Sequence, residues 1–129
     1  FLTFPADATD VYRHTFPRMA AKTKQFYERY PIDIERAAAV SDILQSRKVT
    51  LPNGDPLTVE RFQCLGSDFG MKPSFERVHW ILDQAFLDGD GSASASAELS
   101  DEFLSSVMDA TSSRPLYWPL QEFIYATAS

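Results

Sequence analysis

The final predicted helix holds one carboxylate between two aromatic side chains. Trp118, Glu122 and Tyr125 follow one another at steps of four and three residues, which places them on one face of a helix. A carboxylate in apolar company is costly to desolvate unless a cation meets it. That cation is either an arginine of the same protein or the ammonium group of a ligand, for which the aromatic rings would wall an apolar pocket. Spacing alone favours the arginine.

The chain lacks the motif that carries a nucleophilic serine on a strand-to-helix turn. That motif is Gly-x-Ser-x-Gly, and none of the five glycines is followed two positions later by a serine. Cys64 has no base that the sequence predicts beside it, so it is expected to be a small buried hydrophobe. His79 lies beside the inner face of its helix and is expected to be a hydrogen-bonded structural residue, whereas His14 is expected at the surface.

No metal and no cofactor are predicted. The two histidines lie far apart in the sequence, and a single cysteine excludes a multi-cysteine metal site. Residues 88–92 have the composition that starts a calcium loop, but Ala93 occupies the glycine position and Leu99 the place of the bidentate glutamate. The sequence also lacks a glycine-rich phosphate loop, so residues 88–97 are interpreted as a mobile loop of low complexity.

Composition indicates one globular domain over residues 1–129. Hydrophobic residues make up 44% and charged residues 23% of the chain, which suffices for one modest core. A net charge of -6 without any Lys/Arg cluster argues against nucleic acid as a partner. No apolar run is long enough to cross a membrane. The lone Cys64 excludes an internal disulfide and fits a reducing compartment, so a cytoplasmic location is expected.

Hydrophobic periodicity predicts a mostly α fold with about six helices and one small β-hairpin. Apolar residues recur at alternating steps of four and three from Tyr12 to Tyr30, and Pro17 is expected to kink this first helix or delay its regular part. The second helix is expected over 33–46, with an inward face that comprises Ile34, Ala37, Val40 and Leu44.

Short polar residues and glycines mark the remaining boundaries. Asn53-Gly54 predicts a hairpin over 48–57, because both residues accept a positive φ. Gly66 and Gly70 are expected to weaken or end the third helix. The expected N-caps of the third, fourth and fifth helices are Thr58, Ser74 and Ser100, and the last helix is expected between Pro115 and Tyr125.

Several stretches resemble the cap domain of the prolyl aminopeptidases, also called proline iminopeptidases, and they occur in that family's order. Gln121 departs from the pattern, which has histidine there, and residues 88–97 have no counterpart in it. The matching stretches are Val11–Phe16, Phe26–Pro31, Leu51–Gly66, Phe75–Leu82 and Leu120–Tyr125.

The resemblance implies a serine peptidase of the α/β-hydrolase type that releases N-terminal proline from peptides. In this family a Ser-His-Asp triad lies in a core domain, and the helical cap closes over it. The triad would lie outside this chain, so the 129-residue piece alone is expected to be inactive. Its partners would be its own catalytic core and peptides that begin with proline.

The resemblance also assigns site residues. Family caps bind the substrate ammonium with a glutamate, and Glu122 occupies the matching position. Trp118, Tyr125 and Phe69 are expected to wall the proline ring. Glu76 is a second carboxylate candidate, although its place near a helix start also suits a capping or dipole role.

Two alternatives remain open. The chain could be a stand-alone helical module that binds a protein partner through an apolar face. It could also be the cap of an esterase or epoxide hydrolase of the same superfamily. Glu122 distinguishes the peptidase from the latter, because an ester substrate has no ammonium group for it to meet.

Overall fold

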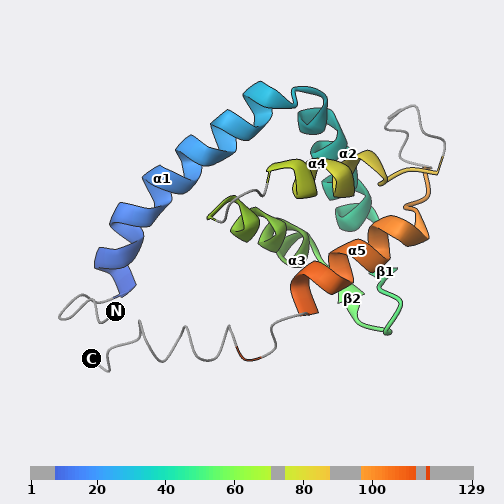
Figure 1. Cartoon of the computed structure of the whole chain (residues 1–129). Coiled ribbons are helices and arrows are strands. Elements are labelled where there is room, and N and C mark those ends of the chain that lie inside the picture. The colour runs from blue at the N-terminus through green and yellow to red at the C-terminus, as the bar shows by residue number, and fades with distance from the viewer. Residues whose placement is uncertain (1–7, 71–74, 88–96, 113–115, 117–129) are drawn as a thin grey trace.

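The computed structural model describes residues 8–70, 75–87, 97–112 and 116. Within these residues the fold is mostly helical with one two-stranded hairpin, as the sequence predicts (Figure 1). The expected cap residue Ser74, the loop at 88–96 and nearly all of the last predicted helix lie outside the described residues. No described helix is long and apolar enough to cross a membrane.

Five α-helices, one 3-10 helix and two short strands follow one another in the described part of the chain. Pro17 lies inside the first helix, which runs through it without a break. In chain order the elements are α1 (Ala8–Arg29), α2 (Ile32–Ser46), β1 (Val49–Thr50), β2 (Pro56–Leu57), α3 (Val59–Gln63), the 3-10 helix η1 (Cys64–Gly70), α4 (Phe75–Asp83) and α5 (Asp101–Ser112).

Caps and turns form where their residue types predict them. The Thr58 hydroxyl accepts a hydrogen bond from the backbone N–H of Arg61, at 3.1 Å, and so caps α3. Ser100 caps α5 by accepting from the N–H of Phe103 at 3.0 Å. In the antiparallel hairpin, Gly54 alone has a positive φ, of 90°, among the described residues.

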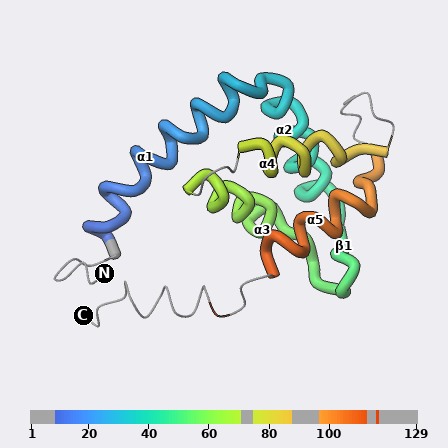
Figure 2. Tube along the Cα trace, in the orientation of Figure 1, coloured from blue at the N-terminus to red at the C-terminus, as the bar shows by residue number. Residues whose placement is uncertain are grey.

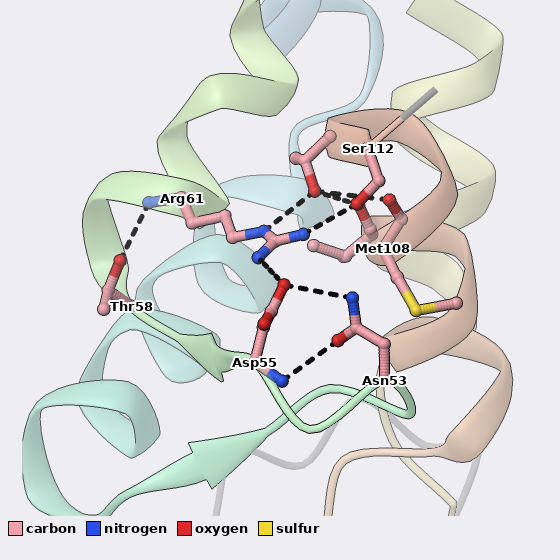
Figure 3. Close-up of polar contacts among 8 residues, drawn as sticks. Asn53, Asp55, Thr58, Arg61, Met108 and Ser112 are labelled. Atoms are coloured by element: carbon pink, nitrogen blue, oxygen red, sulfur yellow. Dashed lines mark hydrogen bonds and ion pairs between the residues drawn. The ribbon is translucent and has the colours of Figure 1, made fainter. Parts of the chain in front are cut away.

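An Arg61-centred cluster fastens the hairpin to the end of α5 (Figure 3). The guanidinium donates to the hydroxyls of Thr111 and Ser112, both at 2.9 Å, and pairs with the Asp55 carboxylate at 3.2 Å. The side chain of Asn53 donates to the same carboxylate at 3.0 Å. One side chain of α3 thereby links the hairpin to the end of α5, which follows Arg61 by about 50 residues in the sequence.

The core lies where α2, α4, α5 and η1 meet the C-terminal end of α1. Its most completely buried large side chains are Phe26, Val40, Ile43, Leu51, Phe103 and Val107. The predicted inner face of α2 is only partly right. Ile34 is half exposed, while Asp33, Arg36, Ala39 and Ile43 are buried together with Val40. The helix is turned this way because its buried face includes an ion pair, which a hydrophobic pattern does not reveal.

That ion pair centres on Asp33, whose side chain is fully buried. One carboxylate oxygen accepts from Arg36 at 3.0 Å, and the other lies 2.7 Å from Nδ1 of His79 on α4. Because an ionised carboxylate only accepts, Nδ1 of His79 is the donor in this hydrogen bond. Arg36 reaches on to Asp83, at the end of α4, at 2.5 Å. The network therefore joins α2 to the middle and the end of α4.

We predict that Asp33→Ala lowers the free energy of unfolding by about 3–5 kcal/mol, because it leaves the buried Arg36 guanidinium with only one carboxylate. Urea unfolding followed by circular dichroism measures the effect. Asp42→Ala, which removes an exposed carboxylate from the same helix, is the matched control and should change the free energy of unfolding by about 0.5 kcal/mol or less. Equal losses in the two variants would contradict the structural importance of the network.

Tyr27 provides a prediction about pH. Burial, and secondly the negative charge of Asp33, raise the pKa of the Tyr27 phenol above its ordinary value of 10.0. Ionisation is therefore harder in the folded state, so stability is fully present below pH 10 and is lost as pH rises through the folded pKa. The free energy of unfolding should fall less steeply above pH 10 in Tyr27→Phe than in the parent chain. Equal slopes in the two proteins would contradict a raised pKa of Tyr27.

Candidate functional site

Of the five residues that the sequence singles out, the structure describes two. Phe69 lies near the end of η1 and Glu76 in the first turn of α4. Trp118, Glu122 and Tyr125 lie outside the described residues, so their assignments stay predictions. Phe69 and Glu76 lie in different surroundings, one in an aromatic cluster and the other among polar groups.

Phe69 is buried in an aromatic cluster that joins η1 to α1 and α4. Its ring centroid lies 4.8 Å from that of Phe26 and 5.3 Å from that of Phe75, which it meets edge-on. Phe26 in turn contacts Tyr27 and Tyr30 through its ring. Such offset and edge-on contacts are the favourable arrangements of aromatic rings, so the position of Phe69 is set by several neighbours at once.

Beside Phe69 lies an open cavity of about 440 Å³ that is lined by residues of α1, α2, α3, η1 and α4. Its walls are mostly apolar, and its polar members are uncharged hydroxyl and amide groups. It is lined by Thr23, Phe26, Tyr27, Ile34, Ala37, Ala38, Ser41, Phe62, Gln63, Leu65, Gly66, Phe69, Val78 and Leu82. Such a lining suits an uncharged apolar group, since Tyr27 is the one ionisable residue that faces it among those the structure describes.

The sequence indicates part of this cavity and misses the rest. The apolar side chains that recur at helical spacing in α1, α3 and η1 are buried, as that spacing predicts. In the cavity these are Phe26, Phe62, Leu65 and Phe69. Ile34 was expected to pack inward and instead lines the cavity while half exposed. Ala37, Ala38 and Ser41 of α2 also line the cavity, but nothing in the sequence predicts that a cavity forms beside them.

Glu76 forms polar contacts with Arg29, the last residue of α1, and with Tyr30, which follows it. Its carboxylate pairs with the guanidinium of Arg29 at 2.5 Å and accepts from the Tyr30 hydroxyl at 3.4 Å. It also stands in the first turn of α4, where a negative charge interacts favourably with the helix dipole. A role towards a substrate ammonium is untested and stays a prediction.

His79 is hydrogen-bonded and structural, as the sequence predicts, through its contact with Asp33. The Tyr30 ring stacks on the imidazole with centroids 3.9 Å apart and an angle of 8° between the planes. His14 is exposed, also as predicted. Cys64 is only half buried, and its thiol donates to the Glu60 carbonyl at 3.3 Å, so the expectation of a buried thiol is met in part.

The partners of Asp33 were missed by sequence reasoning. A signal existed, because Asp33 and Arg36 have the i, i+3 spacing of a helical ion pair. Nothing in the sequence indicates that His79 and Asp83, nearly 50 residues away, complete the network. Among the described residues, no group of three or more histidine, cysteine, aspartate or glutamate side chains could hold a metal ion.

Comparison with known proteins indicates a protein family, which the geometry alone does not. No protein-family model matches the chain. It is similar to a proline iminopeptidase from Aeromonas sobria, with 35% identity over 120 residues, which cover 92% of this chain and 26% of that relative. It is also similar to the proline iminopeptidase aneH from Aspergillus aculeatus, with 32% identity over 75 residues, or 58% of this chain and 16% of that relative.

The chain thus spans about a quarter of the length of the Aeromonas relative. The aligned part includes nearly the whole chain, so the similarity extends well beyond any single motif. These matches agree with the family that the stretches at 11–16, 26–31, 51–66, 75–82 and 120–125 resemble. The chain is therefore a sequence related to the prolyl aminopeptidases, matching one segment of those longer proteins.

Proposed function

We propose that this chain is the helical cap of a full-length prolyl aminopeptidase, an enzyme that releases N-terminal proline from peptides in the cytoplasm. The observation that carries the proposal is the 35% identity to a proline iminopeptidase over 92% of the chain. The mostly helical fold supports the cap assignment, because a cap is a helical layer that covers a catalytic domain and shapes access to it.

In the proposed enzyme the chemistry belongs to an α/β-hydrolase core outside this chain. A serine of that core attacks the prolyl carbonyl, a histidine carries the proton, and backbone donors stabilise the oxyanion. The chain itself has no Gly-x-Ser-x-Gly. The task that falls to it is to select peptides with a free N-terminal proline.

Selection of a free N-terminus requires a carboxylate that can meet an ammonium group. Asp33 already accepts from Arg36 and His79, and Glu76 already pairs with Arg29. The proposal assigns the ammonium to Glu122 because the resemblance matches this residue to the family's glutamate. A charge-assisted hydrogen bond between the two would be among the stronger polar contacts in a shielded site. Glu76 is the second candidate.

The proline ring needs an uncharged apolar surface, and the cavity beside Phe69 offers one. We assign the ring to that cavity, with Phe69 as one wall and Trp118 and Tyr125 as further walls. The neutral lining supports this assignment, because a charged side chain placed there would lose its hydration without gaining a partner. Because the ammonium nitrogen is an atom of the ring, Glu122 would meet that nitrogen at one edge of the ring while the cavity takes the ring methylenes.

We predict that Glu122→Gln in the full-length enzyme lowers kcat/KM for prolyl anilide by about 30-fold or more, since losing one partner of a buried charge pair costs about 2–5 kcal/mol. Glu102→Gln, an exposed site on α5, is the matched control and should behave like the parent enzyme. N-acetylprolyl anilide, which has no ammonium group, should be a poor substrate for all three proteins.

The outcomes separate the candidate functions. Near-normal kcat/KM in Glu122→Gln would refute the ammonium assignment. Equal cleavage of the free and the acetylated anilide would keep the hydrolase but remove recognition of the N-terminus, in favour of an esterase-type cap. Cleavage of neither would contradict the proline assignment and favour an interaction module.

The cavity assignment makes a separate prediction. Gly66 lines the cavity, and a Cβ atom added there meets no atom within 4 Å. Gly66→Leu should therefore fill space without a backbone clash and lower kcat/KM for prolyl anilide by about tenfold or more, mainly through KM. Gly70→Leu adds the same side chain in the same 3-10 helix, also with no atom within 4 Å, but away from the cavity. Equal kinetics in the two variants would place the proline ring elsewhere.

A further inference from the structure

The cavity beside Phe69 is larger than the proline ring assigned to it. Its volume is about 440 Å³, whereas a cavity of about 150 Å³ suffices to bind benzene. Benzene has six ring atoms and proline has five, so one proline ring leaves about two thirds of the cavity unfilled. Unfilled space is unfavourable, because a wall without a neighbouring group forgoes its dispersion contacts. A second group of the substrate is therefore expected in the remainder.

The walls of the cavity differ in how far solvent reaches them. The walls that Phe26, Phe69 and Leu82 supply are closed to solvent, since these side chains are 1%, 7% and 3% exposed. The wall from α2 is open, because Ile34 is 53% exposed and Ala38, one turn further along the helix, is exposed as well. The cavity thus has an inner part beside the buried rings and an outer part along α2.

The outer part lies at the sharp bend where α1 ends and α2 begins (Figure 2). Tyr27 lines the cavity from α1, and Ile34 and Ala38 line it from α2. Burial raises the pKa of the Tyr27 phenol, so this wall is neutral at neutral pH. An apolar group placed here would cover the exposed side of Ile34, which is favourable because it removes apolar surface from water.

The geometry of an extended peptide indicates which group reaches the outer part. Successive side chains of an extended chain point to opposite sides, so the first and third residues face the same way, roughly 7 Å apart. Proteins that bind extended peptides place alternate side chains in pockets for this reason. With the proline ring in the inner part, the third side chain faces the cavity and the second side chain points away from it.

We propose that the outer part of the cavity takes the side chain of the third residue of the peptide. The inference rests on the proposed function, which places the proline ring beside Phe69. The substrate class is then peptides of at least three residues that begin with proline and have a large apolar side chain in the third position. Ile34 and Ala38 are the specificity-determining residues. A charged third residue is disfavoured, because it would lose hydration without meeting an opposite charge among the described lining residues.

Release of proline from three tripeptide amides by the full-length enzyme tests the proposal. The amide of Pro-Gly-Leu places leucine third, that of Pro-Leu-Gly places it second, and that of Pro-Gly-Gly lacks it. Amides remove the C-terminal charge from the comparison. The value of kcat/KM for Pro-Gly-Leu should exceed the values for the other two by about tenfold, because the third leucine leaves water in the complex.

Two variants of α2 test where the third side chain lies. Ala38→Leu fills the outer part and Ile34→Ala removes apolar surface from it, so each should reduce the tenfold preference to about threefold or less. Either variant suffices if the other does not fold. Gln45→Leu adds leucine at an exposed position of α2 that does not line the cavity, and it should keep the parent preference. The preference compares two substrates of one protein, so a general loss of activity does not change it.

Equal kcat/KM for the amides of Pro-Gly-Leu and Pro-Gly-Gly would overturn the proposal, as would a preference for Pro-Leu-Gly. A third-residue preference that persists in both Ala38→Leu and Ile34→Ala would overturn it too, since the side chain would then lie outside the cavity. Prolyl anilide has no third residue and reports on the proposed function separately. An enzyme that cleaves prolyl anilide without distinguishing the amides keeps the proposed function and refutes this inference, whereas one that cleaves neither refutes both.

Discussion

The buried carboxylate of Asp33 is the constraint on which the arrangement of the helices depends. A carboxylate without water needs partners for both oxygens, and here they come from Arg36 on its own helix and His79 on α4. Arg36 extends the network to Asp83, so α2 is held to α4 at two places. Once these helices are joined, Val40 and Ile43 face the core, and the Tyr30 ring stacks on His79 from the turn that ends α1.

This network also shows what sequence reasoning can and cannot predict here. Local signals succeeded at Thr58, Ser100 and Gly54, because a cap or a tight turn depends on residues three or four positions apart. The inner face of α2 was partly wrong. A hydrophobic pattern assumes that apolar residues face inward, but α2 buries Asp33 and Arg36 and leaves Ile34 half exposed. Only the fold brings His79 to Asp33.

The candidate site, too, combines features that local sequence signals predict with contacts that only the fold creates. Phe69 could be predicted, because it continues an apolar spacing through α3 and η1 and is buried as that spacing requires. The cavity beside it could not, since its open volume depends on small residues of α2 lying opposite Phe26 and Tyr27 of α1. Glu76 was found as a candidate from its motif. Its contacts with Arg29 and Tyr30 depend on how α1 ends beside α4 and are invisible in the sequence.

The last turn of α1 contributes both to a polar contact and to the apolar cavity. Arg29 pairs with Glu76, while Phe26 and Tyr27, three and two residues earlier, line the cavity. Tyr12 and Phe16 lie on the continuation of the same helix, which runs unbroken through Pro17. Phe26 packs on Phe69 of η1, so the contacts that bury the C-terminal end of α1 also set one wall of the cavity.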